Sequence, residues 1–206
     1  MAEPGIPGFW LDEPQKEKSY HLTSGGVRVC RESGDSMSWP EIVIQSLKDH
    51  EVNIIAYVPD VVTWRILSKL ENDPYFRVVP AAREEEAMGI IAGVYAAKKR
   101  GAVFMQSSGL GNCINALGSM CIPWRIPLPF FISMRGESGE FNPAQVPMGR
   151  AVRPILEALG LRYFTLNQRE GLEKVVTEAM DQCYSHLLPV GVLLSTVLTG
   201  GKLGTS

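Results

Sequence analysis

The stretch "VPAAREEEAMGIIAGVY", residues 79–95, passes from an apolar run into a helical pattern that opens with three glutamates. The run "FRVVPA" (76–81) is short and rich in apolar and β-branched residues, as strands buried on both faces are. After it, Glu84 shares a helical face with Met88 and Ile91, which follow at offsets of four and seven. A strand followed directly by a helix predicts one unit of an α/β fold.

The same alternation continues along the chain. Further apolar runs of this kind lie at 52–58, 102–108, 128–134, 161–166 and 190–195. Helical patterns lie near 61–72, 84–99, 111–122, 149–159 and 170–186. Ahead of the first run, Ser38 and Glu41 have capping-box spacing with Pro40 in the first turn, which predicts a helix start there. The sequence therefore predicts an α/β fold, with a mostly parallel six-stranded sheet and helices on both faces.

Size and composition favour one domain with a single arm. The chain has 206 residues, 45% of them hydrophobic, which is enough to bury one substantial core. Residues 1–38 are rich in Gly, Pro, Ser and charge without a helical or strand period, so we expect a flexible N-terminal arm. The folded domain is expected at 39–197, and a short tail at 198–206.

Charge and cysteine usage exclude several classes of function. The 20 Lys and Arg residues are balanced by 22 Asp and Glu, and no basic run could follow a nucleic acid backbone. The cysteines form no CxxC pair and no metal-ligand spacing with histidine, which argues against zinc and for reduced thiols; they are Cys30, Cys113, Cys121 and Cys183. No stretch resembles a signal peptide or a membrane span, so we expect a cytoplasmic protein that binds neither nucleic acid nor membrane.

Ligands of parallel sheets collect at the carboxyl ends of the strands, so the segments after each run hold the candidate site. Acids in the first turn of a helix are usually solvated and favoured by the helix dipole, by about 0.3–1 kcal/mol each. Glu84, however, aims along an apolar stripe, where desolvation would raise its pKa and allow proton exchange near neutrality. Helical geometry does not exclude Glu85 from this role.

The segment "SSGLGN" (107–112) ends another strand and resembles a phosphate-binding loop. It lacks the Lys-Ser/Thr of a P-loop and the third glycine of a dinucleotide fingerprint. By itself it indicates a strand-to-helix turn in which Ser108 or Asn112 serves as a cap.

Two charged residues near strand ends each have two interpretations. Arg135 could clamp an anionic substrate, or it could pair with Glu137 or Glu140 within its loop. Asp60 ends the run at 52–58, where it could reach into a cleft or cap the next helix, and first principles favour the cap.

Together these segments resemble the pyrimidine-binding (PYR) domain of thiamine-diphosphate enzymes, most closely the sulfopyruvate decarboxylase α-subunit family and the related phosphonopyruvate decarboxylases. The resemblance runs from about Ser38 to Thr196 and rests on "SLKDHEVNIIAYVPD", "REEEAMGIIAGVYAAKKRG", "MQSSGLGN", "FFISMRGE" and "NPAQVPMGRA". In that family a glutamate nine residues before the second residue of an Ala/Asp-Gly pair bonds N1′ of the cofactor's aminopyrimidine. Here Ala92-Gly93 is the pair, and Glu84 is the glutamate.

The resemblance also implies roles for the other candidates. Residues expected to line the cofactor are Gln106, Ser107, Ser108, Gly109 and Asn112. Arg135 and Gln145 become candidates for holding the substrate's sulfonate or phosphonate and its carboxylate. Asp60 matches a position near the reacting centre, which favours the cleft over the cap. The implied reaction is decarboxylation of a 2-oxo acid, most closely 3-sulfopyruvate to sulfoacetaldehyde and CO2.

The family's second half, a pyrophosphate-binding (PP) domain with Gly-Asp-Gly and a downstream Asn that hold Mg²⁺, has no counterpart in the sequence. The nearest string, Gly34-Asp35-Ser36, lacks the last glycine. The resemblance therefore implies a separate β subunit that carries the PP domain and the Mg²⁺ ligands, in a complex of at least α2β2, with no metal ligand in this chain. The alternatives are a phosphonopyruvate decarboxylase, an acetolactate-type carboligase subunit, and a non-catalytic scaffold or regulatory subunit of the same fold.

Overall fold

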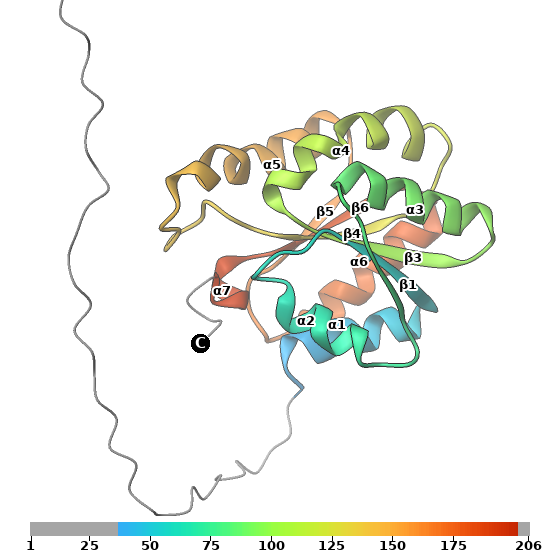
Figure 1. Cartoon of the computed structure of the whole chain (residues 1–206), viewed down its shortest axis with the longest axis horizontal. Coiled ribbons are helices and arrows are strands. Elements are labelled where there is room, and N and C mark those ends of the chain that lie inside the picture. The colour runs from blue at the N-terminus through green and yellow to red at the C-terminus, as the bar shows by residue number, and fades with distance from the viewer. Residues whose placement is uncertain (1–36, 202–206) are drawn as a thin grey trace, which may run out of the picture. The chain divides into compact units, whose positions relative to one another are not determined.

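The computed structural model describes residues 37–201, and its centre is a parallel sheet with the strand order β2-β1-β3-β4-β6-β5 (Figure 1). The strands are β1 Val52–Tyr57, β2 Arg77–Pro80, β3 Arg100–Gln106, β4 Pro129–Ser133, β5 Tyr163–Leu166 and β6 Val190–Leu194. Every neighbouring pair runs parallel. This confirms the predicted α/β class with a six-stranded sheet. Most of the arm expected at 1–38 and of the tail expected at 198–206 lies outside the described residues, at 1–36 and 202–206, whereas the short helix Thr196–Thr199 extends into the expected tail.

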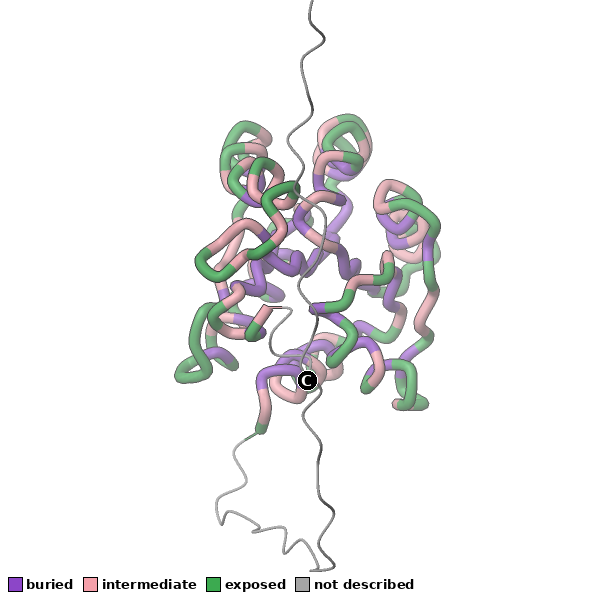
Figure 2. The backbone as a smooth tube through the Cα atoms, turned by 60° about the vertical axis from the view of Figure 1, so that its left-hand side comes forward, coloured by how far each residue is buried: buried purple, intermediate pink, exposed green. Residues whose placement is uncertain are grey.

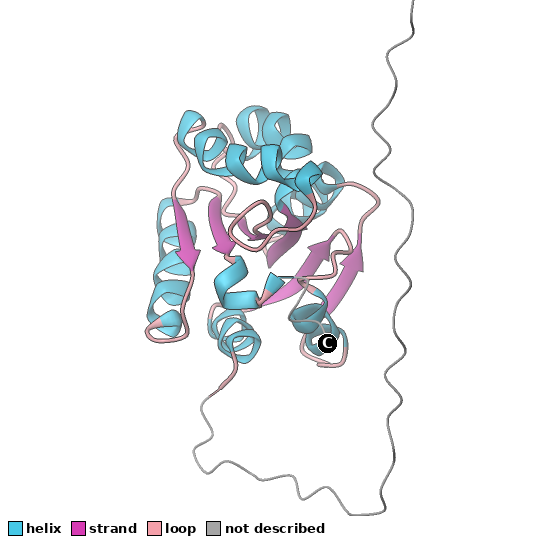
Figure 3. Cartoon of the chain, turned by 90° about the vertical axis from the view of Figure 1, so that its left-hand side faces the viewer, coloured by secondary structure: helices cyan, strands magenta, loops and turns pink. Residues whose placement is uncertain are grey.

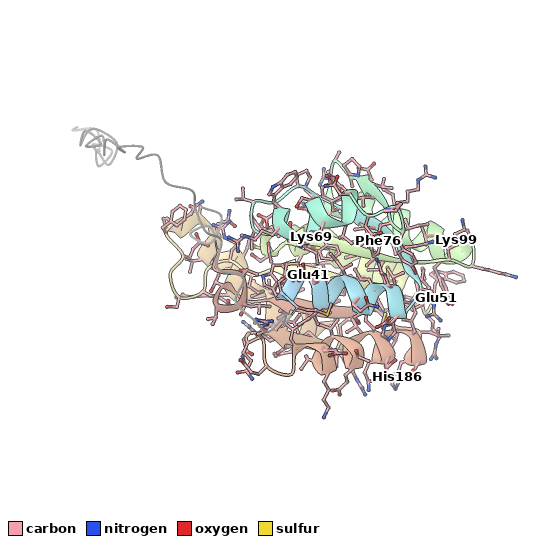
Figure 4. All side chains as sticks on the ribbon, turned by 90° about the horizontal axis from the view of Figure 1, so that it is seen from below. Glu41, Glu51, Lys69, Phe76, Lys99 and His186 are labelled. Carbon is pink, nitrogen blue, oxygen red and sulfur yellow. The ribbon has the colours of Figure 1, made fainter. Side chains whose placement is uncertain are left out.

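The helices form one layer on each face of the sheet (Figure 3). One layer holds α1 Trp39–Asp49, α2 Trp64–Glu71 and α6 Leu172–His186, and the other holds α3 Glu84–Ala96, α4 Leu110–Ala116 and α5 Val146–Ala158. The short α7, Thr196–Thr199, follows β6. Figure 4 shows two residues of the first layer, Glu41 on α1 and Lys69 on α2, whose carboxylate and ammonium lie 2.8 Å apart.

The core lies on both faces of the sheet, because successive strand residues point to opposite sides. In β3, Phe104 faces the layer of α1, α2 and α6, while Val103 and Met105 face the layer of α3, α4 and α5. The register pairs Phe104 with Phe131 of β4, and their rings stack with centroids 4.6 Å apart. Figure 2 shows the buried residues gathered inside and the exposed ones on the outer helical turns. Burial on both sides explains the nearly continuous apolar runs in the sequence.

Several element boundaries differ from the sequence prediction for local reasons. The helix expected near 61–72 begins only at Trp64, because the Asp60 carboxylate accepts from the backbone N–H groups of Val62 and Thr63 and holds residues 61–63 as a turn. The helix expected near 111–122 is α4 followed by a π-helical turn over Leu117–Cys121. The predicted capping box is confirmed, since the Ser38 backbone N–H donates to Glu41 Oε2 at 2.8 Å.

The strand order places the site. The chain runs from β1 outward to β2 and then returns to β3 on the other side of β1, so the connections diverge between β1 and β3. Crevices at the carboxyl ends of strands that diverge in this way are the usual ligand sites of open parallel sheets. Asp60, Glu84 and Gln106 follow or end β1, β2 and β3 and therefore approach this edge. No helix within residues 37–201 is long and apolar enough to cross a membrane.

Candidate functional site

Glu84 is the first residue of α3 and lies partly buried against α4. Its Oε2 accepts a hydrogen bond of 2.9 Å from Asn112 Nδ2. Arg83, the residue before it, is extended, so the chain turns sharply into the helix and brings the carboxylate to the positive end of the helix dipole. One carboxylate oxygen is thus fixed by a neutral donor of a second helix.

Gly109 allows this placement of Glu84. A Cβ added at Gly109 would lie 2.5 Å from Cδ of Glu84 and closer still to its Cγ and Oε1. Real Cβ atoms essentially never approach other atoms so closely, so the backbone of residue 109 lies directly against the carboxyl group. Gly109 is therefore needed because a side chain at this position would collide with Glu84. Backbone conformation is not the reason, since its φ of −67° is one that any residue adopts.

Each of the two neighbouring glutamates has a local partner for one oxygen, while Glu85 Oε2 is buried without a hydrogen-bond partner among the described residues. Glu85 Oε1 pairs with Nε of Arg83 at 2.8 Å, and Glu86 Oε2 accepts from the backbone N–H of Ala82 at 2.7 Å. Glu84 is the member of the triplet that is bonded to another helix. The structure therefore distinguishes the three acids by geometry, and Glu84 remains the candidate catalyst.

The Cys113 thiol lies buried near these acids and is uncharged. Cys113 of α4 is buried, and burial, followed by the nearby Glu84 and Glu85 carboxylates, raises the pKa of its thiol well above the ordinary value. The thiol therefore stays neutral and unreactive at physiological pH. Within residues 37–201, no group of three or more His, Cys, Asp or Glu side chains is arranged to hold a metal ion.

A second cluster of polar groups begins at Gln106, the last residue of β3. Gln106 Nε2 donates to Ser108 Oγ at 2.8 Å and to Gln145 Oε1 at 2.9 Å, and Gln106 Oε1 accepts from Arg135 at 3.2 Å. Gln145 arrives from the short 3-10 turn that precedes α5. The structure therefore brings together four residues to which the family resemblance assigned cofactor or substrate roles.

Arg135 makes an intramolecular ion pair. Its guanidinium donates two hydrogen bonds to Glu140, Nε to Oε2 at 2.6 Å and Nη2 to Oε1 at 2.7 Å. Both side chains are almost completely buried, with 2% and 4% exposed. The hydrogen bonds from Arg135 lower the pKa of Glu140 to about 2. Of the two loop acids considered as partners, Glu140 pairs with Arg135, whereas Glu137 bonds Arg153 and Thr196.

Asp60 caps its turn and also reaches across the sheet edge. Besides the two backbone N–H groups of the turn, its Oδ2 accepts a 2.6 Å hydrogen bond from Ser133, the last residue of β4. The carboxylate therefore closes the turn that leads into α2, and it does not cap that helix as first principles predicted, because the N-cap position of α2 is Thr63. The sequence analysis missed Ser133, although a lone hydroxyl ending the apolar run "PFFIS" was a signal that could have identified it.

The fit of a cofactor can be tested on the segment that joins the two clusters. The Ser107 hydroxyl is completely buried and has no hydrogen-bond partner among the described residues. It lies between Gln106 and the backbone of Ser108-Gly109, which approaches Glu84. An unsatisfied hydroxyl, a bare glycine backbone and a carboxylate with one oxygen held suit a polar heterocycle that presents a ring nitrogen.

The fold and the geometry define an α/β protein with a candidate site at the carboxyl edge of a parallel sheet, next to a glutamate that begins a helix. No family model matches the sequence. The sulfopyruvate decarboxylase subunit alpha of Methanothermobacter thermautotrophicus is 38% identical over 154 residues, which cover 75% of this chain and 93% of the relative. The chain belongs to the sulfopyruvate decarboxylase alpha-subunit family.

Longer proteins match the chain over part of their length. A sulfopyruvate decarboxylase of Methanosarcina acetivorans is 36% identical over 71% of this chain but only 38% of its own length. A phosphonopyruvate decarboxylase of Streptomyces viridochromogenes is 31% identical over 69% of this chain and 36% of its own length. A solved structure of 2-oxoglutarate:ferredoxin oxidoreductase from Magnetococcus marinus superposes with a TM-score of 0.61 at 12% identity, over 79% of this chain and 29% of that one, and shows the shared fold.

Proposed function

We propose that this chain is the α subunit of a thiamine-diphosphate-dependent decarboxylase that converts 3-sulfopyruvate to sulfoacetaldehyde and CO2. The observation that carries the proposal is Glu84, placed at a helix start against the bare backbone of Gly109, in a chain that belongs to the sulfopyruvate decarboxylase alpha-subunit family. Phosphonopyruvate decarboxylase is the second candidate, supported by the match of 31% identity.

Thiamine diphosphate would be held on this chain by its aminopyrimidine end. Glu84 would face the ring nitrogen N1′, while Ser107, Ser108 and Gly109 would line the ring, with Gln106 and Asn112 at either side. When bound, the cofactor would supply a nucleophilic carbon for the 2-oxo group and would take up the electron pair that remains when CO2 leaves. A carboxyl group that shares a proton with the ring is what this chain contributes to that chemistry.

The remaining residues orient the participating groups. The hydrogen bond from Asn112 stops rotation of the Glu84 carboxylate and leaves Oε1 for the proton transfer. Asp60, held by Ser133 and by the turn, lies at the same sheet edge, where its carboxylate is a candidate for proton transfer to the product. Its fixed geometry supports a role at the reacting centre in addition to its role in the turn.

The proposal includes a partner subunit. Relatives that cover most of their own length with this chain, such as the Methanothermobacter thermautotrophicus protein, are named as subunit alpha, which supports a partner polypeptide. That partner would be a β subunit with the PP domain and the Mg²⁺ ligands, in a complex of at least α2β2. A cytoplasmic location belongs to the same proposal, and the unpaired Cys113, Cys121 and Cys183 thiols support it.

Reconstitution tests this proposal. The chain is purified with the product of a neighbouring reading frame that carries Gly-Asp-Gly and a downstream Asn, and CO2 and sulfoacetaldehyde are quantified with 3-sulfopyruvate, thiamine diphosphate and Mg²⁺. We expect turnover by the mixture and none by either chain alone. Turnover of phosphonopyruvate in its place would support the second candidate. If calorimetry detects no cofactor binding by the mixture, a scaffold or regulatory function replaces the proposed one.

A further inference from the structure

The polarity of the Gln106 cluster is fixed by its charged end. A guanidinium can only donate hydrogen bonds, so the Gln106 atom that faces Arg135 must be the carbonyl oxygen Oε1. The amide nitrogen of Gln106 is therefore turned to the other side, where it donates to Ser108 and Gln145. This assignment follows from the chemistry of Arg135 and leaves no freedom to flip the amide.

The same logic extends one residue further. Because Gln106 Nε2 donates, the Gln145 atom that receives the bond must be its oxygen, and both N–H bonds of Gln145 Nε2 point elsewhere. Ser108 Oγ likewise accepts from Gln106, so its own proton is available. Among residues 37–201, no hydrogen bond takes the Ser108 proton or the Gln145 N–H groups. Both side chains are partly exposed, so the cluster presents donors at the sheet edge.

The positive charge of Arg135, unlike the donors of Ser108 and Gln145, is not available to bind a substrate anion. Its guanidinium is 2% exposed and is paired through two bonds with Glu140, which also accepts from the backbone N–H of Asn142 at 2.9 Å. A buried charge that loses such a partner is strongly destabilised. A substrate anion would have to displace Glu140 to reach Arg135.

On the basis of the proposed function, we propose that the substrate's sulfonate is bound by the neutral donors Gln145 Nε2 and Ser108 Oγ, and that Arg135 is a positioning residue that fixes their direction through Gln106. Arg135 thus sets the polarity of the cluster, while Glu140 cancels its charge. The result is a site that offers hydrogen bonds but no net positive charge.

Such a site discriminates between tetrahedral anions. A sulfonate is a monoanion at neutral pH, has no proton to donate, and is satisfied by donors alone. A phosphonate carries a charge closer to that of a phosphoryl group, about −1.5 to −2 at pH 7, and needs cationic partners. The cluster supplies none, because Glu140 cancels the charge of Arg135, so it selects the sulfonated substrate over the phosphonated one.

The first test is Gln145→Glu in the reconstituted α and β complex. The new carboxylate keeps the acceptor for Gln106 but replaces the outward N–H groups with a negative oxygen. We expect KM for 3-sulfopyruvate to rise at least tenfold. The kcat and the Kd of thiamine diphosphate should change less than threefold, and the Tm should change by less than about 3 °C. Gln45→Glu, at an exposed position of α1, is the matched control.

An unchanged KM in Gln145→Glu would overturn the inference. A rise in KM accompanied by weaker cofactor binding and a lower Tm would also overturn it, because it would indicate a purely structural role. The second test compares inhibition by 3-phosphonopyruvate at pH 8. We expect a Ki at least tenfold above KM for 3-sulfopyruvate, whereas an equal or lower Ki would show that Arg135 binds the anion directly. A wild-type complex that turns over no 3-sulfopyruvate would refute the proposed function, and the inference with it.

Discussion

Replacing Gly109 with alanine should disable catalysis without unfolding the protein. The added Cβ would lie 2.5 Å from Cδ of Glu84, and ordinary van der Waals contact begins at 3.4 Å, so the carboxyl group must move by about 1 Å. The carboxylate ends a flexible side chain and Gly109 has an ordinary helical φ, so we expect the free energy of unfolding to change by less than about 1 kcal/mol. Displacement of a reacting group by about 1 Å lowers rates on the order of 100-fold.

The assay measures kcat for CO2 release by the reconstituted complex together with the Tm of the variant. Gly118→Ala is the matched control, because it lies on the same helical stretch and its Cβ would meet only Leu159 Cδ2 at an ordinary 3.6 Å. We expect a drop of about 100-fold in kcat for Gly109→Ala and none for Gly118→Ala. A Gly109→Ala complex with wild-type kcat would refute the placement of Glu84 against residue 109.

Three further predictions concern stability and reactivity. The lowered pKa of Glu140 contributes stability that is fully present above the unfolded-state pKa near 4.5. We expect this contribution to be lost as pH falls from about 4.5 to 2, measured by equilibrium unfolding at fixed urea. Glu140→Gln should lack this pH dependence. Phe104→Ala should lower the free energy of unfolding by about 3–5 kcal/mol, measured by urea titration, because it empties a buried site stacked on Phe131; a loss below about 1 kcal/mol would contradict that packing. Cys113 should react with a thiol reagent only after unfolding, and rapid labelling of the native protein would contradict its burial and raised pKa.

The sequence predicted the architecture because the sheet is buried on both faces. Strands such as "PFFIS" have no polar face to interrupt the run, and each is followed by a helix with its own period. Boundaries were less accurate where long-range contacts decide them. The strand expected at 102–108 begins two residues earlier, at Arg100, whose guanidinium stacks on the Tyr184 ring at 4.4 Å and donates to the His50 carbonyl.

The candidate site divides in the same way. Helical periodicity favoured Glu84 without excluding Glu85, and only the fold shows that Asn112, which is 28 residues away in sequence, bonds to Glu84. The Ser133 bond to Asp60 spans 73 residues and no local pattern specifies it. Such contacts depend on strand order, which a single sequence reports weakly. The sequence also could not decide whether Arg135 binds a substrate anion or pairs with Glu137 or Glu140, because the pairing with Glu140 depends on the geometry of the loop.

The most direct test of the account is the activity of Glu84→Gln in the reconstituted complex, measured as CO2 release from 3-sulfopyruvate beside Glu86→Gln as the matched control. Glutamine keeps the size of the side chain and its bond from Asn112 but cannot share a proton with the cofactor. We expect the Glu84 variant to lose about 100-fold to 10,000-fold in kcat, while the Glu86 variant, whose carboxylate only accepts from the Ala82 backbone, stays within a fewfold of wild type. Wild-type turnover by Glu84→Gln would contradict the account.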